Sequence, residues 1–476
     1  MRDTVRFRLD GQLHEIQNPD PTQTVLRWLR TAVQRTGTKE GCAEGDCGAC
    51  TVVLGEDLSG RTVYRAVNAC ILFLPMLDGK TLFTVESLSA PGAALHPVQQ
   101  EMVDANASQC GFCTPGFVMS LYAHYLNRGD VGAAAIQDAL AGNLCRCTGY
   151  GPIVEAARRM NDLPRVDAET QSAPSGAESL AIVHDARRFF APHTRDELAA
   201  LYLRYPEATL LAGGTDVGLW VTKKLDVLPT VISVNNVAGL RRITQTQDAL
   251  EIGATVTYTQ AYEALAALHP DFGELLRRLG SVQVRNAGTI GGNIANGSPI
   301  GDSAPPLIAL GATLVLRRGD KIRQMKLEDF FLAYDKQDRG PGEFVEKVIV
   351  PKLKPDAAFR VYKISKRFDQ DISALCGAFL IRRDGAAVRE ARICYGGMAG
   401  TPKRASAAEA ALTGKPFDEA AVRAAMQALE DDYSPLTDMR ASAAYRMTAA
   451  KNLLYKAWLE ISGASATRVL GVAADG

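Results

Sequence analysis

The stretch KEGCAEGDCGACTV, residues 39–52, places three cysteines and three glycines where a hydrophobic core could not form. Cys42, Cys47 and Cys50 follow the spacing C-x4-C-x2-C, and Cys70 follows after nineteen further residues. This spacing is typical of plant-type [2Fe-2S] ligation. Glycines let a loop wrap closely and turn its N–H groups toward anionic sulfides. The stretch therefore predicts an iron–sulfur cluster. Structural zinc is the alternative, although zinc usually takes its four cysteines as two short pairs.

A second group of cysteines lies further along the chain, in QCGFCTPG and GNLCRCTGYGP, and consists of Cys110, Cys113, Cys145 and Cys147. Each pair precedes an expected helix, one beginning near Pro115 and the other near Pro152. Proline suits a first helical turn, and the positive helix N-termini would face a negatively charged cluster and lower the thiol pKa values. We expect a second iron–sulfur cluster here. Zinc remains the alternative, although C-x-C is uncommon among its spacings.

The composition is that of a globular protein with several domains. The chain has 476 residues, 47% of them hydrophobic, and a formal net charge of zero. Such a charge balance argues against nucleic acid or an anionic membrane as partner. The N-terminus alternates apolar and polar residues around Asp10-Gly11, which predicts a β-hairpin rather than a signal peptide. Without a signal peptide or an apolar membrane span, we expect a cytoplasmic protein whose ten cysteines stay reduced.

The fold class expected is α+β with several domains. Eight of the ten cysteines precede Thr148, and the segment NDLPRVDAETQSAPSGAE that follows loses all periodicity, as a linker does. The predicted division is residues 1–87 (ferredoxin-like α+β), 88–162 (helical bundle), 163–179 (linker), 180–355 (α+β) and 356–476 (α+β).

Two further glycine stretches stand out, LLAGGTDVGLW at 210–220 and TIGGNIANGSPIGD at 289–302. The chain has no G-x-G-x-x-G fingerprint, so a Rossmann dinucleotide site is unsupported. Consecutive glycines can form an anion-binding nest for a pyrophosphate, to which Thr215, Asn293 and Ser298 could add hydrogen bonds. Taken alone, however, such loops are more often simple tight turns.

Together, the two cysteine groups resemble the molybdenum hydroxylase family, in which these motifs hold two [2Fe-2S] clusters. All eight ligand positions match. The resemblance also implies a non-Rossmann FAD-binding domain in residues 180–355 and a C-terminal flavoprotein domain in residues 356–476. Where relatives often place an aromatic ring before the second glycine stretch, this sequence has Leu279. The FAD contacts implied are Leu210, Leu211, Ala212, Gly213, Gly214, Thr215, Asp216, Val217, Thr289, Ile290, Gly291, Gly292, Asn293, Asp302, Val345 and Lys363.

Less specific features concern the electron acceptor. The resemblance implies Tyr334 beside the flavin near the entry of NAD, and the charged loop Lys366–Asp371 bordering the nicotinamide. Read alone, Tyr334 is a packing aromatic and the loop a solvated charge run. We expect Cys376 and Cys394 to be small buried hydrophobes. The six histidines form no metal-binding pattern, and no residue other than Tyr334 is a candidate for catalysis in this chain.

The resemblance implies an electron-transfer chain. The family's molybdenum–pterin domain has no counterpart in these 476 residues, so we expect it on a large partner subunit, in a dimer of heterodimers. Electrons from hypoxanthine or xanthine, oxidised there to urate, would pass through the cluster of Cys110, then that of Cys42, then FAD, to NAD. The alternatives are an equivalent subunit of an aldehyde or N-heterocycle hydroxylase, a stand-alone flavin and iron–sulfur carrier, and a zinc-stapled binding module.

Overall fold

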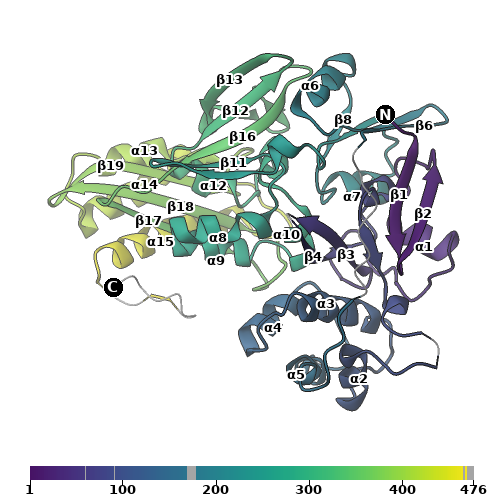
Figure 1. Ribbon diagram of the computed structural model, residues 1–476. Helices are drawn as coiled ribbons and strands as arrows, with labels where there is room; N and C mark the ends of the chain where they lie inside the picture. Colours follow the sequence, from purple (N-terminus) through teal and green to yellow (C-terminus); the bar gives the residue numbers. More distant parts are fainter. Residues whose placement is uncertain (59, 91, 169–177, 465–466, 469–476) are drawn as a thin grey trace. The chain divides into compact units, whose positions relative to one another are not determined.

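The computed structural model describes all residues except 59, 91, 169–177, 465–466 and 469–476, so half of the expected linker lies outside it (Figure 1). The described residues form two compact units. The first comprises 1–238 with 280–288, and the second 239–279 with 289–476. Both mix helices and strands, which confirms the expected α+β class. Within the described part of the chain, no helix has the length and apolar character needed to cross a membrane.

The first unit begins with a five-stranded sheet of order β2-β1-β5-β3-β4 and one helix, α1. The expected hairpin is confirmed, with Thr4 opposite Gln17 and left-handed φ values at Asp10 and Gly11. The helix ends at Thr31, and shortly after it Gln34 adopts a φ of 57° that an α-helix excludes. The elements are β1 (Thr4–Leu9), β2 (Gln12–Gln17), α1 (Val25–Thr31), β3 (Thr51–Leu58), β4 (Arg61–Asn68) and β5 (Thr81–Phe83).

Four helices follow, and Figure 1 shows them as one group. Helix α3 is the central one, because Phe117, Leu121 and Tyr125 on successive turns are all buried in the same core. Its burial on nearly all sides accounts for a sequence that is apolar all round. The expected helical bundle is confirmed, and its helices are α2 (Pro97–Asp104), α3 (Thr114–Leu126), α4 (Ala133–Leu140) and α5 (Gly151–Arg159).

The rest of the first unit is a sheet of order β6-β7-β9-β8 with three helices. Strands β7, β9 and β8 run parallel, and β6 pairs antiparallel with β7. Helix α10 joins this unit from far along the chain, since Asn286 Nδ2 donates to the carbonyl of Ala66 over 2.9 Å. The elements are β6 (Leu180–His184), β7 (Arg187–Ala191), α6 (Arg195–Arg204), β8 (Thr209–Leu211), α7 (Val217–Thr222), β9 (Thr230–Ser233) and α10 (Val282–Ala287).

The second unit contains a five-stranded antiparallel sheet of order β10-β11-β16-β12-β13, with four helices and a small hairpin. The strands are β10 (Ile243–Gln245), β11 (Ala249–Gly253), β12 (Thr313–Arg318), β13 (Lys321–Lys326), β16 (Phe344–Pro351) and the hairpin strands β14 (Phe331–Ala333) and β15 (Lys336–Gln337). The helices are α8 (Tyr258–Leu268), α9 (Pro270–Arg277), α11 (Ile290–Asn296) and α12 (Ala304–Ala309).

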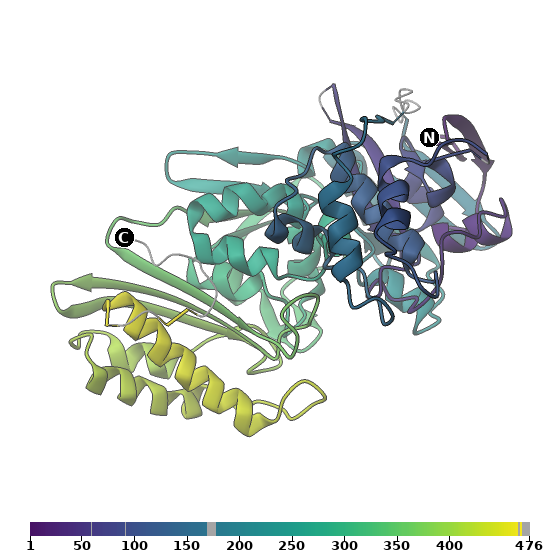
Figure 2. The same cartoon turned by 90° about the horizontal axis from the view of Figure 1, so that it is seen from below.

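A second antiparallel sheet completes this unit, and Figure 2 shows the C-terminal helices along one side of it. Strand β18 is buried on both faces, because Cys376 and Ala378 enter one hydrophobic core while Leu375 and Phe379 enter the other. Cys376 and Cys394 are buried as expected. The elements are β17 (Ala357–Ile364), β18 (Leu375–Asp384), β19 (Ala387–Gly396), β20 (Lys403–Arg404), α13 (Ser406–Leu412), α14 (Glu419–Asp432) and α15 (Ala443–Ile461).

A buried charge network fastens the C-terminal segment to helix α9. The Arg468 guanidinium donates to both oxygens of Asp271, over 2.6 and 2.9 Å, and the Asp271 side chain is only 2% exposed. Burial alone would raise the pKa of Glu460, but hydrogen bonds from Arg468 and its neighbours lower it to about 2. This depressed pKa contributes stability above about pH 4.5 that is lost as the pH falls toward 2.

We expect Arg468→Met to lower the free energy of unfolding by about 3 kcal/mol, because the buried Asp271 carboxylate would lose its partner. Urea unfolding followed by circular dichroism measures the change. The control is Arg423→Met, since the Arg423–Glu419 pair is exposed and we expect a change within about 0.5 kcal/mol. Equal effects of the two substitutions would contradict the assignment.

Candidate functional site

The first four cysteines meet at the end of a β-hairpin. Cys50 immediately precedes β3 and Cys70 follows β4. Because Thr51 pairs with Asn68 in this antiparallel ladder, the two cysteines lie side by side, and both are buried. Cys42 and Cys47 reach them from the glycine-rich loop before β3. The hairpin thus fixes half of the group, and the loop supplies the other half.

The sulfur atoms of this group contact one another. The Cys47 and Cys70 thiols hydrogen-bond to the Cys42 sulfur, and Cys70 also contacts Cys50. The Cys42 sulfur accepts further bonds from the amides of Glu44, Asp46 and Cys47, over 3.5, 3.4 and 3.3 Å. These contacts hold the pKa of Cys42 far below its usual range, and the donated bonds raise the pKa values of Cys47 and Cys70. Four converging thiols with amides directed at sulfur are a donor set that fits an iron–sulfur cluster.

Glycines make the loop possible. A Cβ at Gly41 would lie 2.8 Å from the Cys47 sulfur, and one at Gly48 would lie 2.1 Å from the carbonyl oxygen of Gly142. Gly45 and Gly48 also have φ values of 78° and 70°, which side chains disfavour. The backbone therefore approaches the sulfurs more closely than any larger residue would allow.

The second four cysteines lie before two helices. Cys113 is the N-cap of α3, while Cys145 and Cys147 lie in the loop that leads to α5. The expected positions of Pro115 and Pro152 in the first helical turns are confirmed. Contacts pair Cys110 with Cys147 and Cys113 with Cys145, so the structure brings together all four.

Their electrostatics differ from those of the first group. A backbone amide at Phe112 and the Cys147 thiol lower the pKa of Cys110, although that residue is exposed. Burial raises the pKa of Cys113 to about 12. For Cys145, burial opposes ionisation, but bonds with the hydroxyl and amide of Thr148 prevail and lower the pKa. Each pair thus combines a thiol of lowered pKa, Cys110 or Cys145, with a thiol of raised pKa, Cys147 or Cys113.

No group of three or more His, Cys, Asp or Glu side chains in the described ranges is arranged to hold a single metal ion. A [2Fe-2S] cluster, however, takes its four thiolates on two irons rather than on one. The thiol contacts above form four-residue groups of this kind. Binding of metal would also require all four thiols of each group to be deprotonated.

The two cysteine loops touch each other through their backbones. The amide of Leu144 donates to the carbonyl of Cys47 over 3.0 Å. A Cβ at Gly116, in helix α3, would lie 2.2 Å from the carbonyl oxygen of Gly48. Leu144 precedes Cys145, so one hydrogen bond joins a cysteine of the first group to the residue before a cysteine of the second.

The first glycine stretch, 210–217, connects β8 to α7. A Cβ at Gly213 would lie 1.8 Å from the carbonyl oxygen of Ala287, and Gly214 has a φ of 74°. On its other side, a Cβ at Gly218 would lie 2.7 Å from Ile71, the residue after Cys70. The stretch therefore packs directly against the first cysteine group. This contact was not evident from sequence.

The second glycine stretch begins helix α11. The Thr289 side chain caps the helix by accepting from the Gly292 amide over 3.0 Å, and Ser303 donates to Asn293 Oδ1 over 2.7 Å. A Cβ at Gly291 would lie 2.5 Å from Ala254, so only a glycine allows α11 to pack this closely against the segment that follows β11. The Ser298 side chain accepts from the Ile300 amide.

Asp302 and Lys363, both expected to contact FAD, form a buried ion pair. Lys363 Nζ lies 2.6 Å from Asp302 Oδ2, with the two side chains 2% and 6% exposed. The Ser373 hydroxyl donates to the other carboxylate oxygen over 2.6 Å. Val345 lies in the hydrophobic core of the same unit, against which Leu279 packs half-buried. The pairing of Asp302 with Lys363 was not evident from sequence.

Tyr334 and the charged loop lie at the surface. Tyr334 is 66% exposed at the turn of the β14–β15 hairpin. A Cβ placed at Gly400 would lie 3.6 Å from the Tyr334 Cβ. In the loop Lys366–Asp371, the Arg367 amide donates to the Asp371 carboxylate, and the Phe368 ring lies 4.4 Å from the Arg278 guanidinium. The loop is thus more ordered by local contacts than a solvated charge run would be.

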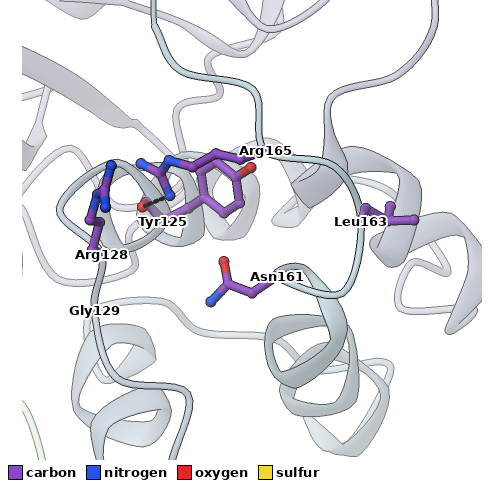
Figure 3. A pocket seen from close by; sticks show the side chains of 6 residues that line it. All are labelled: Tyr125, Arg128, Gly129, Asn161, Leu163 and Arg165. Atoms are coloured by element: carbon purple, nitrogen blue, oxygen red, sulfur yellow. Dashed lines mark hydrogen bonds between the residues drawn. The ribbon is translucent and has the colours of Figure 1, made fainter.

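A cavity of about 230 Å³ lies at the C-terminal end of α3, the end opposite Cys113 (Figure 3). The Arg165 guanidinium stacks on the Tyr125 ring at 4.7 Å and donates to the Tyr125 carbonyl. None of the expected site residues lines this cavity, whose walls are Tyr125, Arg128, Gly129, Asn161, Leu163 and Arg165.

We expect Cys50→Ala to halve the iron content of the purified protein and to remove one of two iron–sulfur signals, because Cys50 is buried within the first group alone. Iron analysis and low-temperature electron paramagnetic resonance measure this. The control is Cys394→Ala, a buried cysteine in a hydrophobic core, which should retain all the iron. Undiminished iron in Cys50→Ala would refute the ligand assignment.

Comparison with known proteins places these features in a family. Four family models match in order: a 2Fe-2S iron-sulfur cluster binding domain at 7–74, a [2Fe-2S] binding domain at 84–158, the FAD binding domain in molybdopterin dehydrogenase at 184–353, and the CO dehydrogenase flavoprotein C-terminal domain at 360–461. The expected architecture of two iron–sulfur domains, an FAD-binding domain and a C-terminal domain is therefore confirmed.

Whole-chain relatives agree. The chain is 32% identical to xanthine dehydrogenase of Emericella nidulans and 28% identical to aldehyde oxidase 2 of Rattus norvegicus, in each case over 96% of this chain and 39% of the relative. It thus spans about two fifths of the length of these relatives.

A carbon monoxide dehydrogenase from Hydrogenophaga pseudoflava provides a structural match, with a TM-score of 0.54 and 29% identity over 58% of this chain and 96% of that one. With its two cysteine groups, its flavin domain and these relatives, the chain belongs to the molybdenum hydroxylase family, as an iron–sulfur and FAD module.

Proposed function

We propose that the chain is the electron-transfer subunit of a xanthine dehydrogenase, carrying electrons from a molybdenum centre on a partner chain to NAD during oxidation of hypoxanthine and xanthine to urate. The observation that carries this proposal is the convergence of two cysteine groups joined by one backbone hydrogen bond, in a chain that is 32% and 31% identical to two xanthine dehydrogenases over 96% of its length. When bound, the clusters would supply one-electron transfer and the flavin would couple it to hydride chemistry.

The residues that would hold the clusters are the eight cysteines in their two groups. Asn68 supports the first group, since its side chain donates to the Gly45 carbonyl over 2.9 Å and lies 3.8 Å from the Cys50 sulfur. Tyr150 supports the second, because its hydroxyl accepts from the Cys145 amide over 3.0 Å. These contacts hold both loops in place around the sulfurs.

The FAD residues implied by the resemblance lie in both units, and each set is considered by itself. In the first unit, the Gly213–Gly214 turn lies against Ile71, so a flavin held there would adjoin the first cysteine group. In the second unit, the Asp302–Lys363 pair and the cap at Thr289 provide a fixed polar frame around α11. We assign NAD to the surface near Tyr334 and the loop Lys366–Asp371.

The second cysteine group favours a partner chain. Cys110 and Cys147 are exposed, and Phe112 beside them is 47% exposed. An exposed redox site with an exposed aromatic neighbour fits a surface that another protein covers. The carbon monoxide dehydrogenase chain is matched over 96% of its own length by 58% of this chain, which supports a modular assembly with a separate molybdenum subunit here. We infer a dimer of such heterodimers, located in the cytoplasm where the thiols stay reduced.

An aldehyde or N-heterocycle hydroxylase is the second candidate, because the similarity to aldehyde oxidase 2 covers the same share of the chain. Substrate choice would lie in the partner, so this chain cannot distinguish the two. A stand-alone carrier would differ by purifying without a molybdenum-containing chain.

We expect the purified complex to form NADH when offered xanthine. The reason is that the similarity extends over nearly the whole chain to xanthine dehydrogenases. Absorbance at the NADH maximum measures the rate, with an aromatic aldehyde as the control substrate. NADH formation with the aldehyde alone would move the protein to another branch of the family.

We expect Cys113→Ser to abolish xanthine-dependent NADH formation, since it removes one sulfur from the second group while leaving the partner intact. Reduction of an artificial acceptor that takes electrons at the molybdenum site should persist. Normal NADH formation by this variant would refute the assignment of Cys113.

We expect Tyr334→Ala to raise the KM for NAD several-fold and to leave reduction of artificial acceptors unchanged, because Tyr334 is exposed and its loss should not disturb packing. Steady-state kinetics with varied NAD measure this. The matched control is Leu332→Ala in the same hairpin, 56% exposed, which should leave the KM unaltered. An equal change in both variants would contradict a specific role for Tyr334.

A further inference from the structure

A single buried glutamine contacts the loops of both cysteine groups. Gln283, on helix α10, is 1% exposed. Its side-chain nitrogen lies 3.1 Å from the Thr51 hydroxyl, 3.2 Å from the Ser120 hydroxyl and 3.2 Å from Asn143 Oδ1. Thr51 follows Cys50 of the first group, and Asn143 is two residues before Cys145 of the second. All these residues belong to the first unit.

The partners of Gln283 lead to the hydrogen bond between the loops. The carbonyl of Gly48 accepts from the Thr51 hydroxyl over 2.7 Å and from Asn143 Nδ2 over 3.1 Å. Gly48 is next to Cys47, and Asn143 is next to Leu144. Gln283 therefore acts, through Thr51 and Asn143, on the residue beside each end of the bond from the Leu144 amide to the Cys47 carbonyl.

The junction has no room for adjustment. A Cβ at Gly142 would lie 1.7 Å from Gln283 Oε1, and one at Gly48 would lie 2.1 Å from the Gly142 carbonyl oxygen. Gln283 Oε1 is buried and, among the described residues, has no hydrogen-bond partner. An unpaired buried oxygen is unfavourable for folding, so packing alone would favour an apolar side chain at this position. The hydrogen bonds of the side-chain nitrogen to Thr51, Ser120 and Asn143 account for an amide at this position.

We propose that Gln283 is a positioning residue that sets the backbone contact between the two cysteine loops and, with it, the rate of electron exchange between the two clusters. This inference rests on the proposed function, in which both groups carry [2Fe-2S] clusters. The rate of electron transfer through a protein falls steeply as the two redox centres move apart and as bonded contacts between them are lost. The bond from Leu144 to Cys47 is a direct bonded route between the loops that begins at a cysteine of the first group, and Asn143, which Gln283 contacts, also bonds Gly48 directly. A residue that fixes these bonds therefore controls this rate.

A matched control lies on the same helix. Asn286 is also a buried amide of α10, but its side chain donates to the Ala66 carbonyl in strand β4. Loss of Asn286 would remove this one bond to β4 while the bonds of Gln283 to Thr51 and Asn143 stay in place. Gln283→Met and Asn286→Leu remove the two amides at nearly constant volume and so separate positioning from helix anchoring.

The experiment uses the full chain in complex with its partner and compares wild type, Gln283→Met and Asn286→Leu. Iron content and the spectrum of each cluster are recorded first. Electron paramagnetic resonance of the fully reduced protein then measures the spin–spin interaction between clusters, and flash photoreduction measures how fast an electron redistributes between them. We expect Gln283→Met to keep its iron, to show a weaker interaction and to redistribute electrons several-fold more slowly. Asn286→Leu should match wild type.

Further variants keep the proposal open to refutation if Gln283→Met fails to fold. Thr51→Val removes the hydroxyl between Gln283 and Gly48 and should slow redistribution, whereas Thr51→Ser keeps the hydroxyl and should restore the wild-type rate. Unchanged interaction and rate in Gln283→Met, or equal rates in the two Thr51 variants, would overturn the role of Gln283. Wild-type protein without iron would instead overturn the proposed function itself.

Discussion

The structure of the first unit depends on the close contact between two cysteine loops at the bond from the Leu144 amide to the Cys47 carbonyl. Backbones approach this closely only because Gly48, Gly116 and Gly142 have no side chains. The loops belong to an α+β domain and a helical domain that would otherwise need no particular relation to each other. A shared backbone contact fixes the two cysteine groups as one site, which is what electron exchange requires.

Helix α10 extends this constraint to the flavin region. Gln283 on this helix lies 140 residues after Asn143 and 232 residues after Thr51, yet it contacts both loops, and Ala287 abuts the Gly213 turn. One short helix therefore adjoins both cysteine groups and one implied flavin stretch. The two cysteine groups and this glycine stretch are all neighbours of the same six-residue element, so a shift of α10 would alter all three together.

The sequence alone predicted the parts of this arrangement that depend on local spacing. Neighbouring residues alone indicate the cysteine spacings, the prolines in the first turns of α3 and α5, and the hairpin at Asp10-Gly11. The structure contains the two prolines at these positions and the hairpin. Long-range partners were missed, because a buried Gln283 or an Asp302–Lys363 pair carries no local pattern.

The glycine stretches show why a motif can be strong in a family and weak in a single sequence. Gly213 and Gly291 are both required by close backbone contacts within the protein, to Ala287 and to Ala254. Packing thus explains these glycines without any ligand, just as their interpretation as simple tight turns would. Only their place beside the Ile71 contact and the buried Asp302–Lys363 pair distinguishes them from ordinary turns, and that place is a property of the folded chain. The chemistry of such a loop therefore resides in its neighbours more than in its own residues.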